Sequence, residues 1–378
     1  MGHSMATQAS KAPQKPIRIG IVRLSSFGDV VVSASKLADF YRALQQEYDE
    51  VCIEWFVDTR FAGLLEHHHA ITTLHALPIK RLKSLRAIRE LWQRLRALGS
   101  FDVVLDLQGL IKSALVGCAL DSRRFVGFSF SSAREGVASV FYNERVKIAY
   151  DSNILARNAA IYQQALKVAL SEPAAEPSAM QSISQAKTSQ APSGFGWDTK
   201  QALSLLESSA QAALDSSAYR VLFVLEASIA QKTYPLEQFA ALAHLMQQAS
   251  AQKITFCLIY HEHKDRALSL CAMLEASGLS ACVFPPLDFN ALKYVLSQMH
   301  CVIGGDTGVT HLAWALQSPQ VITLLGNPQT SRGKNMRDTK LSRVLLGNPY
   351  VLSQSGSFEI ASIPPESICC AWLDSRAM

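Results

Sequence analysis

The amino-acid sequence predicts an α/β protein made of two parallel-sheet domains that face each other across a cleft. Short apolar runs rich in β-branched residues alternate with segments in which apolar residues recur every three or four positions, a pattern typical of parallel sheets. A stretch rich in Ser, Ala, Gln and Pro over residues 171–217 separates the two halves. With 378 residues, of which 49% are hydrophobic, the chain is long enough for two cores.

These observations predict five successive segments. They are a disordered tail over residues 1–16, a Rossmann-like domain over 17–170, a linker or insertion over 171–217, a second Rossmann-like domain over 218–345, and a tail over 346–378 with a helix packing back on the N-terminal domain.

Composition restricts the class of protein. No apolar run approaches the roughly 18 residues of a membrane span, and the start of the chain lacks the apolar segment of a signal peptide, so we expect a soluble, cytoplasmic protein. Eight cysteines without a C-x-x-C pair suit buried thiols in a reducing compartment, with no disulfide and no zinc site. The net charge of +5 is modest, and we expect no nucleic-acid partner.

The segment 17–44 organises the first domain. Residues 17–24 read as a strand and residues from 30 onward as a helix, so the polar SSFGD between them forms the turn and places Asp29 at the ligand crevice. Asp29 is either a functional acid or, like Ser26, a helix cap. The spacing matches neither G-x-G-x-x-G nor a P-loop.

A basic segment follows the second predicted strand (51–60) and a short helix (61–68). Residues 80–96 carry seven cations against one acid, Glu90. The apolar positions, spaced by three or four, predict an amphipathic helix that buries Leu82, Leu85, Ile88, Leu91, Trp92 and Leu95. The cations are either a solvated surface or a patch for a phosphorylated or membrane-embedded partner.

The next strand, turn and helix repeat the same arrangement. Residues 101–109 and 111–120 place Asp106, Gln108 and Lys112 at the same sheet edge as Asp29. Asp106 is equally well explained as a satisfied structural acid. Residues 123–128 then predict a strand, and 131–146 a polar loop with a helical turn.

The second half reads as an independent parallel α/β domain. Its predicted strands cover 219–228, 253–260, 281–284 and 320–326, and its predicted helices cover 235–249, 261–278 and 288–299. Residues 301–316 predict a further strand, turn and helix.

The sequence IGGDTGVTHL is the strongest ligand signal. Its glycines allow a ligand to approach the backbone, and the amides of residues 307–309 open a helix where a diphosphate is stabilised by hydrogen bonds and by the helix dipole. The alternative is a tight turn capped by Asp306. His311, one turn later, is either a ligand contact or a packed histidine.

The loop EASIAQKTYP carries Ser228 and Lys232 toward the same crevice. A lysine there would offset the charge that develops on a phosphate leaving group, although a lone lysine in a loop is more often without a role. The chain has no D-x-D pair to hold a divalent metal on a diphosphate, so we expect no metal and no other cofactor. The histidine clusters at 67–69 and 261–263 lack zinc spacing.

Taken together, SSFGDVV, DLQGLIKSAL, AREGVASVFYN, AQKTYP and GGDTGVTHLAWAL resemble the bacterial lipopolysaccharide heptosyltransferases, most closely the heptosyltransferase I branch. The resemblance covers nearly all of residues 17–326. It implies a GT-B fold, with the acceptor bound by the N-terminal domain and the donor by the C-terminal one. It also implies inverting transfer of L-glycero-D-manno-heptose from ADP-heptose to a Kdo sugar on the lipid A core.

The resemblance also implies roles for individual residues. Asp29 matches the catalytic base and Lys232 the lysine that contacts the donor diphosphate. The expected donor-binding residues are Ser228, Glu262, Asp306, Thr307, Gly308, Val309 and His311. The expected acceptor-binding residues are Ser26, Lys80, Arg81, Lys83, Asp106, Gln108, Lys112 and Arg134. The chain departs from the family where Thr-Thr becomes Ala227-Ser228, and Glu262 is the candidate for binding the ribose.

As partners we expect a nucleotide-sugar donor and Kdo-lipid A, with peripheral contact to the inner face of the cytoplasmic membrane and a monomeric enzyme. One alternative is another GT-B transferase or epimerase that acts on a different nucleotide sugar. The other is a two-domain binding protein without catalysis, a class that is mostly exported.

Overall fold

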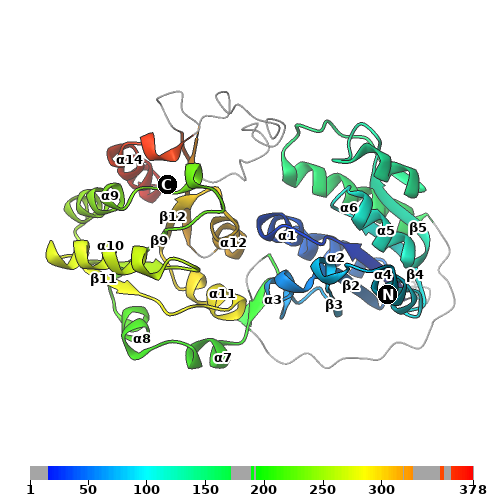
Figure 1. Ribbon diagram of the computed structural model, residues 1–378, viewed down its shortest axis with the longest axis horizontal. Coiled ribbons are helices and arrows are strands. Elements are labelled where there is room, and N and C mark those ends of the chain that lie inside the picture. The colour runs from blue at the N-terminus through cyan, green and yellow to red at the C-terminus, as the bar shows by residue number, and fades with distance from the viewer. Residues whose placement is uncertain are drawn as a thin grey trace, which may run out of the picture.

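Two six-stranded parallel sheets form the framework of the computed structural model (Figure 1). The structure describes residues 16–171, 189–190, 193–317, 319–326, 350–352 and 359–377. The strand orders are β3-β2-β1-β4-β5-β6 and β11-β10-β9-β12-β13-β14. Both orders are that of a dinucleotide-binding fold, in which the order reverses beside the first strand and opens a crevice there. The predicted α/β class with two facing domains is confirmed.

The N-terminal sheet contains β1 (Ile17–Val22), β2 (Val51–Asp58), β3 (Thr73–Leu77), β4 (Ser100–Asp106), β5 (Asp121–Phe128) and β6 (Glu144–Val146). Its helices are α1 (Phe27–Ala34), α2 (Leu37–Gln45), α3 (Ala62–Leu65), α4 (Leu85–Arg96), α5 (Ile111–Ala119) and α6 (Ile154–Leu170), with 3-10 turns η1 (Thr59–Phe61), η2 (Ile79–Arg81) and η3 (Gly136–Phe141).

Two layers of helices cover this sheet. The side chains of α1, α2 and α6 share one hydrophobic cluster, to which Val31, Phe40 and Ile161 belong. On the opposite face α4, α5 and η3 share a second cluster, to which Leu95 and Ala114 belong. Because both faces are covered, the central strands read as continuous apolar runs instead of alternating ones.

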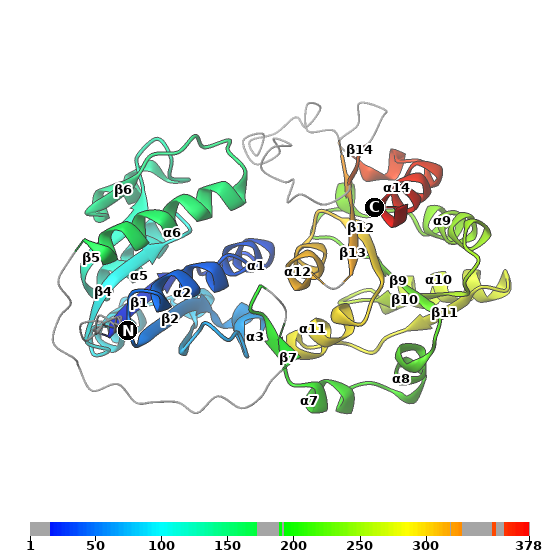
Figure 2. The same cartoon turned by 180° about the vertical axis from the view of Figure 1, so that it is seen from behind.

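The C-terminal sheet contains β9 (Tyr219–Val224), β10 (Ile254–Ile259), β11 (Ser280–Val283), β12 (Cys301–Gly305), β13 (Gln320–Leu325) and β14 (Tyr350–Leu352). Its helices are α7 (Thr199–Ser204), α8 (Ser208–Asp215), α9 (Leu236–Ala249), α10 (Lys264–Ala276), α11 (Phe289–Ser297), α12 (Gly308–Leu316) and α14 (Pro365–Ala377), with turns η4 (Ala230–Lys232) and η7 (Ile360–Ser362). A small antiparallel pair, β7 (Ser189–Gln190) and β8 (Gly196–Trp197), lies beside α3 and α11 (Figure 2).

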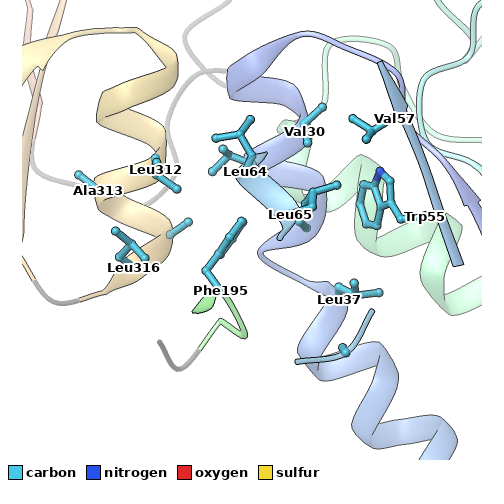
Figure 3. Packing of buried hydrophobic residues seen from close by; sticks show 14 of the residues in the cluster. Val30, Leu37, Trp55, Val57, Leu64, Leu65, Phe195, Leu312, Ala313 and Leu316 are labelled. Carbon is cyan, nitrogen blue, oxygen red and sulfur yellow. The ribbon is translucent and has the colours of Figure 1, made fainter. Parts of the chain in front are cut away.

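One apolar core joins the two domains. Phe195 is fully buried and lies between Leu312 and Leu316 of α12 on one side and Leu64 and Leu65 of α3 on the other (Figure 3). This core holds the domains in the arrangement that defines the cleft.

Two polar and aromatic contacts reinforce that junction. The buried Lys293 ammonium of α11 donates to the carbonyl oxygen of Glu66 at 2.6 Å, and the Phe27 and Phe289 rings meet edge to face at 5.3 Å. α11 therefore lies against both α3 and α1, and α1 also packs against α12.

The predicted linker is corrected in part. Residues 172–188 and 191–192 lie outside the described residues, but residues 193–217 fold: Phe195 and Trp197 are buried, and α7 packs against α11. This segment contributes Phe195, Trp197 and Leu206 to the core that joins the two domains.

The C-terminal helix is also corrected. α14 packs against α9, β13 and β14 of the C-terminal domain, where Ile368 and Trp372 are fully buried. The prediction that it would pack on the N-terminal domain is wrong. β14, at residues 350–352, extends this domain past the predicted boundary at 345, and residues 327–349 lie outside the description.

The basic segment differs most from its prediction. Lys80 and Arg81 lie in η2 and Lys83 in the following loop, and the helix α4 begins at Leu85 after its cap Ser84. Of the expected apolar face only Leu91 and Leu95 are buried, while Leu85, Ile88 and Trp92 are exposed. Among the described residues, no helix has the length and apolarity needed to cross a membrane.

Candidate functional site

Asp29 occupies the first turn of α1, where the chain leaves β1. Ser26 precedes the helix, and its amide and hydroxyl donate to Asp29 Oδ2 at 3.3 and 3.0 Å. This closes the helix start in the manner of a capping box. The Asp29 side chain nevertheless remains 39% exposed. The same carboxylate therefore caps the helix and stays accessible as an acid.

Arg23 controls the electrostatics of Asp29. This residue follows β1 directly, is buried, and places Nη2 3.0 Å from Asp29 Oδ2 while Nη1 donates to the Leu107 carbonyl oxygen. Burial raises the pKa of Asp29, but Arg23 and the Ser26 hydrogen bonds outweigh it and hold the pKa below its ordinary value. The sequence analysis missed Arg23, although a single cation ending an apolar strand was a usable signal.

Asp106 at the end of β4 is a structural acid. It is fully buried, and Oδ1 accepts from the Gln108 and Gly109 amides while Oδ2 accepts from the Ser113 and Tyr142 hydroxyls at 2.8 and 2.7 Å. Burial raises its pKa against these hydrogen bonds. Both carboxylate oxygens therefore accept hydrogen bonds from neighbouring segments of the N-terminal domain. This geometry supports the alternative that Asp106 is a structural acid.

Gln108 has a similar role. Its side-chain oxygen accepts from the Leu24 amide at 2.8 Å, and its amide nitrogen lies 3.3 Å from the Ser25 hydroxyl oxygen. Asp106 and Gln108 thus shape the turn that carries Asp29. The exposed Lys112 and Arg134 lie at the same edge, because the loop containing Arg134 packs against Gly109.

The second half of the site joins the lysine loop to the turn after β12. Lys232 Nζ lies 2.6 Å from Asp306 Oδ2, and His311 Nε2 lies 3.0 Å from Asp306 Oδ1. Burial raises the pKa of Asp306, but His311 and Lys232 overcome it and hold that pKa well below the usual range. Asp306 therefore aligns two groups that can contact an anion.

Glycine is required where these segments meet. A Cβ atom on Gly305 would overlap the Lys232 carbonyl oxygen, so only glycine lets the lysine loop pass this close. Thr307 caps α12 by accepting from the Thr310 amide, and the amides of Gly308 and Val309 open the helix without a partner among the described residues. This is the geometry of an anion site at a helix N-terminus.

The two halves face each other directly. A Cβ atom on Gly28 would approach His311 Cδ2 to 2.6 Å, and one on Gly308 would overlap the Phe27 ring. His311 also contributes to lowering the pKa of Asp29. The structure thus brings Asp29, Lys232, Asp306 and His311 together across the cleft, from three segments of the chain.

The remaining predicted donor residues are less engaged. Ser228 is exposed in the loop after β9, and Glu262 is exposed in the turn after β10. Glu226, which the sequence analysis did not select, accepts from the amides of His261, Glu262 and His263 at 2.9–3.1 Å. Glu226 therefore fixes the turn on which Glu262 lies.

The basic residues Lys80, Arg81 and Lys83 are exposed and follow β3 at the carboxyl edge of the sheet, the same edge as Asp29.

Within the described ranges, no group of three or more His, Cys, Asp or Glu side chains is placed to hold a metal ion.

Two facing dinucleotide-type domains, with an acid at one helix start and a lysine beside the other, are the arrangement of the GT-B fold. The chain belongs to glycosyltransferase family 9 (heptosyltransferase), whose sequence model matches residues 88–344. The predicted family and fold are confirmed.

The chain is similar to lipopolysaccharide heptosyltransferase 1 of Campylobacter coli, with 28% identity over 361 residues, 93% of this chain and 97% of the relative. It is 25% identical to lipopolysaccharide heptosyltransferase 1 of Escherichia coli K12 over 313 residues, 81% and 86% of the two chains.

Solved structures share the fold. E. coli heptosyltransferase WaaC with ADP matches with a TM-score of 0.68 and 21% identity, covering 95% of this chain and 99% of that one. A family 9 glycosyl transferase from Veillonella parvula matches with a TM-score of 0.69 and 14% identity, covering 95% and 97%.

Proposed function

We propose that this family 9 enzyme transfers L-glycero-D-manno-heptose from ADP-heptose to a Kdo sugar of the lipopolysaccharide inner core, with inversion. The curated relatives are named lipopolysaccharide heptosyltransferase 1, and WaaC has been solved with ADP and with ADP-2-deoxy-2-fluoro heptose. The observation that carries the proposal is the opposition of Asp29 to the Lys232–Asp306–His311 group across one cleft.

The donor diphosphate would lie at the start of α12. The Gly308 and Val309 amides and the helix dipole favour an anion there, and Lys232 adds a full positive charge. As the bond between the anomeric carbon and the phosphate oxygen breaks, negative charge grows on ADP. Donors already in position stabilise that charge most in the transition state.

Asp29 would act as the general base. It takes the proton from the acceptor hydroxyl while that oxygen bonds to the anomeric carbon from the face opposite ADP, which inverts the configuration. Its lowered pKa keeps the carboxylate ionised, and Arg23 holds it in place. Ser26, whose hydroxyl donates to Asp29, would contact the acceptor beside the base.

The acceptor phosphates would meet the exposed cations at the carboxyl edge of the N-terminal sheet. These are Lys80, Arg81, Lys83, Lys112 and Arg134. We further propose that the enzyme works as a monomer at the inner face of the cytoplasmic membrane, where a lipid A acceptor is available.

The test is product formation from ADP-heptose and Kdo-lipid A, followed by mass spectrometry, with ADP-mannose, UDP-sugars and GDP-sugars as competing donors. We expect transfer from ADP-heptose and not from the competing donors. Preferred use of a UDP- or GDP-sugar would show instead a different nucleotide-sugar transferase or an epimerase.

A further inference from the structure

The N-terminal domain exposes an unusual amount of apolar surface on one helical layer. Of the thirteen large apolar side chains that are exposed in the described part of the chain, eight lie between residues 85 and 140. Three of them form a stripe along α4: Leu85 is 86% exposed, Ile88 47% and Trp92 36%. Burial in a monomer core does not account for this stripe.

The two elements packed next to α4 also expose apolar side chains. α5 packs beside α4 (Figure 1), and its Ile111 and Leu115 are exposed. η3 packs beside α5, and its Val137 and Val140 are exposed. We call these seven side chains the apolar face. Exposed apolar groups gathered in this way mark an interaction surface more often than scattered ones do.

Part of the apolar face lies at the same edge of the sheet as Asp29. In a parallel sheet the helices begin at the carboxyl edge, and Leu85, Ile88, Ile111 and Leu115 fall in the first two turns of α4 and α5. Asp29 begins α1 at that same edge.

Cations flank the α4 part of the apolar face. Residues 79–96 hold seven Lys and Arg side chains and a single acid, Glu90, which is paired with Arg86 at 2.7 Å. A helix with an exposed apolar stripe flanked by Lys and Arg binds in the plane of an anionic membrane, with apolar groups below the phosphates and cations level with them. Trp92 suits the boundary, since its ring is apolar and its N–H is polar.

We propose that the apolar face docks the enzyme on a bilayer that carries anionic headgroups, so that Leu85, Ile88 and Trp92 enter the outer acyl region and the cleft opens at the lipid surface. This deepens the proposed function, because it names how that site reaches an acceptor embedded in a membrane. The other possible occupants of the apolar face are a soluble acidic protein and a second copy of the chain. The test below distinguishes these occupants from a bilayer.

The test is sedimentation of the full-length protein with sucrose-loaded vesicles of phosphatidylcholine, with or without phosphatidylglycerol. We expect binding to the anionic vesicles, and we expect combined Leu85→Ser, Ile88→Ser and Trp92→Ser to weaken it by roughly tenfold or more through lost apolar transfer. The matched control replaces Leu268 and Leu373, which are exposed on α10 and α14, and should bind unchanged.

Folding is checked independently. Leu85 is almost fully exposed, so Leu85→Ser alone cannot disturb a core and should still weaken vesicle binding by about threefold. Brominated phosphatidylcholine should quench a fluorescence component that Trp92→Phe removes. The proposal would be wrong if the triple and single variants bound vesicles as well as the wild-type protein does. It would also be wrong if the wild-type protein bound neither kind of vesicle.

Two further outcomes also decide the matter. If the wild-type protein is a dimer in solution and the triple variant a monomer, the face belongs to a second copy and the proposal fails. On a water-soluble Kdo acceptor without acyl chains the triple variant should keep wild-type turnover. Absence of transfer by the wild-type protein on that acceptor, with vesicle binding intact, would refute the proposed function and leave the docking face standing.

Discussion

Arg23 Nη2 lies 3.0 Å from Asp29 Oδ2, so a buried guanidinium faces the carboxylate that opens α1. Because Asp29 also accepts from Ser26, its oxygen is held in one place and its negative charge is stabilised. The pKa of Asp29 is lowered although the side chain is partly buried. If Asp29 is the base, Arg23 sets the lowest pH at which the enzyme works.

Replacing Arg23 by Met should move the acidic limb of kcat/KM to higher pH. Without the guanidinium the pKa of Asp29 rises, so the carboxylate becomes protonated, and inactive, at a higher pH than in the wild-type enzyme. Arg23→Lys, which keeps a charge, should shift the limb less. The measurement is a pH–rate profile, with Arg42→Met on α2 as a control that leaves the limb in place. An unshifted limb in folded Arg23→Met would separate Arg23 from the ionisation of Asp29.

Asp29→Asn should abolish most transfer while leaving ADP binding nearly intact. Asn keeps the shape of the side chain and can still cap α1, but it cannot take the proton of the acceptor, so the rate should fall on the order of a hundredfold or more. Turnover measured beside ADP titration calorimetry checks this, and Asp39→Asn on α2 is the matched control. Wild-type turnover in Asp29→Asn would reduce Asp29 to a cap.

Lys232→Ala should lower turnover by roughly one to three orders of magnitude. It removes the cation beside the α12 start that would stabilise charge on the leaving diphosphate. Lys264→Ala, at the exposed start of α10, should have no such effect. A change in acceptor KM alone, with kcat preserved, would contradict the leaving-group role.

Activity should survive chelation, because Lys232 and the helix amides would supply the positive field at the diphosphate. The measurement is the initial rate in EDTA against the rate with added magnesium. Complete loss in EDTA that magnesium restores would show that the diphosphate needs a metal ion as well.

Replacing Lys80, Arg81 and Lys83 by Ala should raise the KM for phosphorylated Kdo-lipid A several-fold and leave the KM for ADP-heptose nearly unchanged. These exposed cations would attract lipid phosphates with about 1 kcal/mol each near an anionic surface, an attraction that salt screens over about 8 Å. The salt dependence of the rate should therefore flatten. A stable triple variant with unchanged kinetics would make this segment a solvated surface only.

Much of the candidate site was predictable because local chemistry determines it. Asp29, Lys232, Asp306 and Gly308 each lie where an apolar strand gives way to polar residues, and in parallel sheets such positions share one edge. The roles of Arg23 and Glu226 were missed because each depends on contacts with distant backbone and side chains.

By itself the sequence determined the alternation of strands and helices, the two-domain α/β class and the motifs of the family, since these follow from hydrophobic period and turn chemistry over short stretches. Only the tertiary structure decided which polar groups form hydrogen bonds inside the fold and which face the cleft. Asp106 and Asp29 look alike in sequence, but four donors surround Asp106, whereas Asp29 stays partly exposed. It also decided that Leu85 and Trp92 face outward and that α14 packs on the C-terminal domain, because burial depends on which surfaces the neighbouring elements leave uncovered.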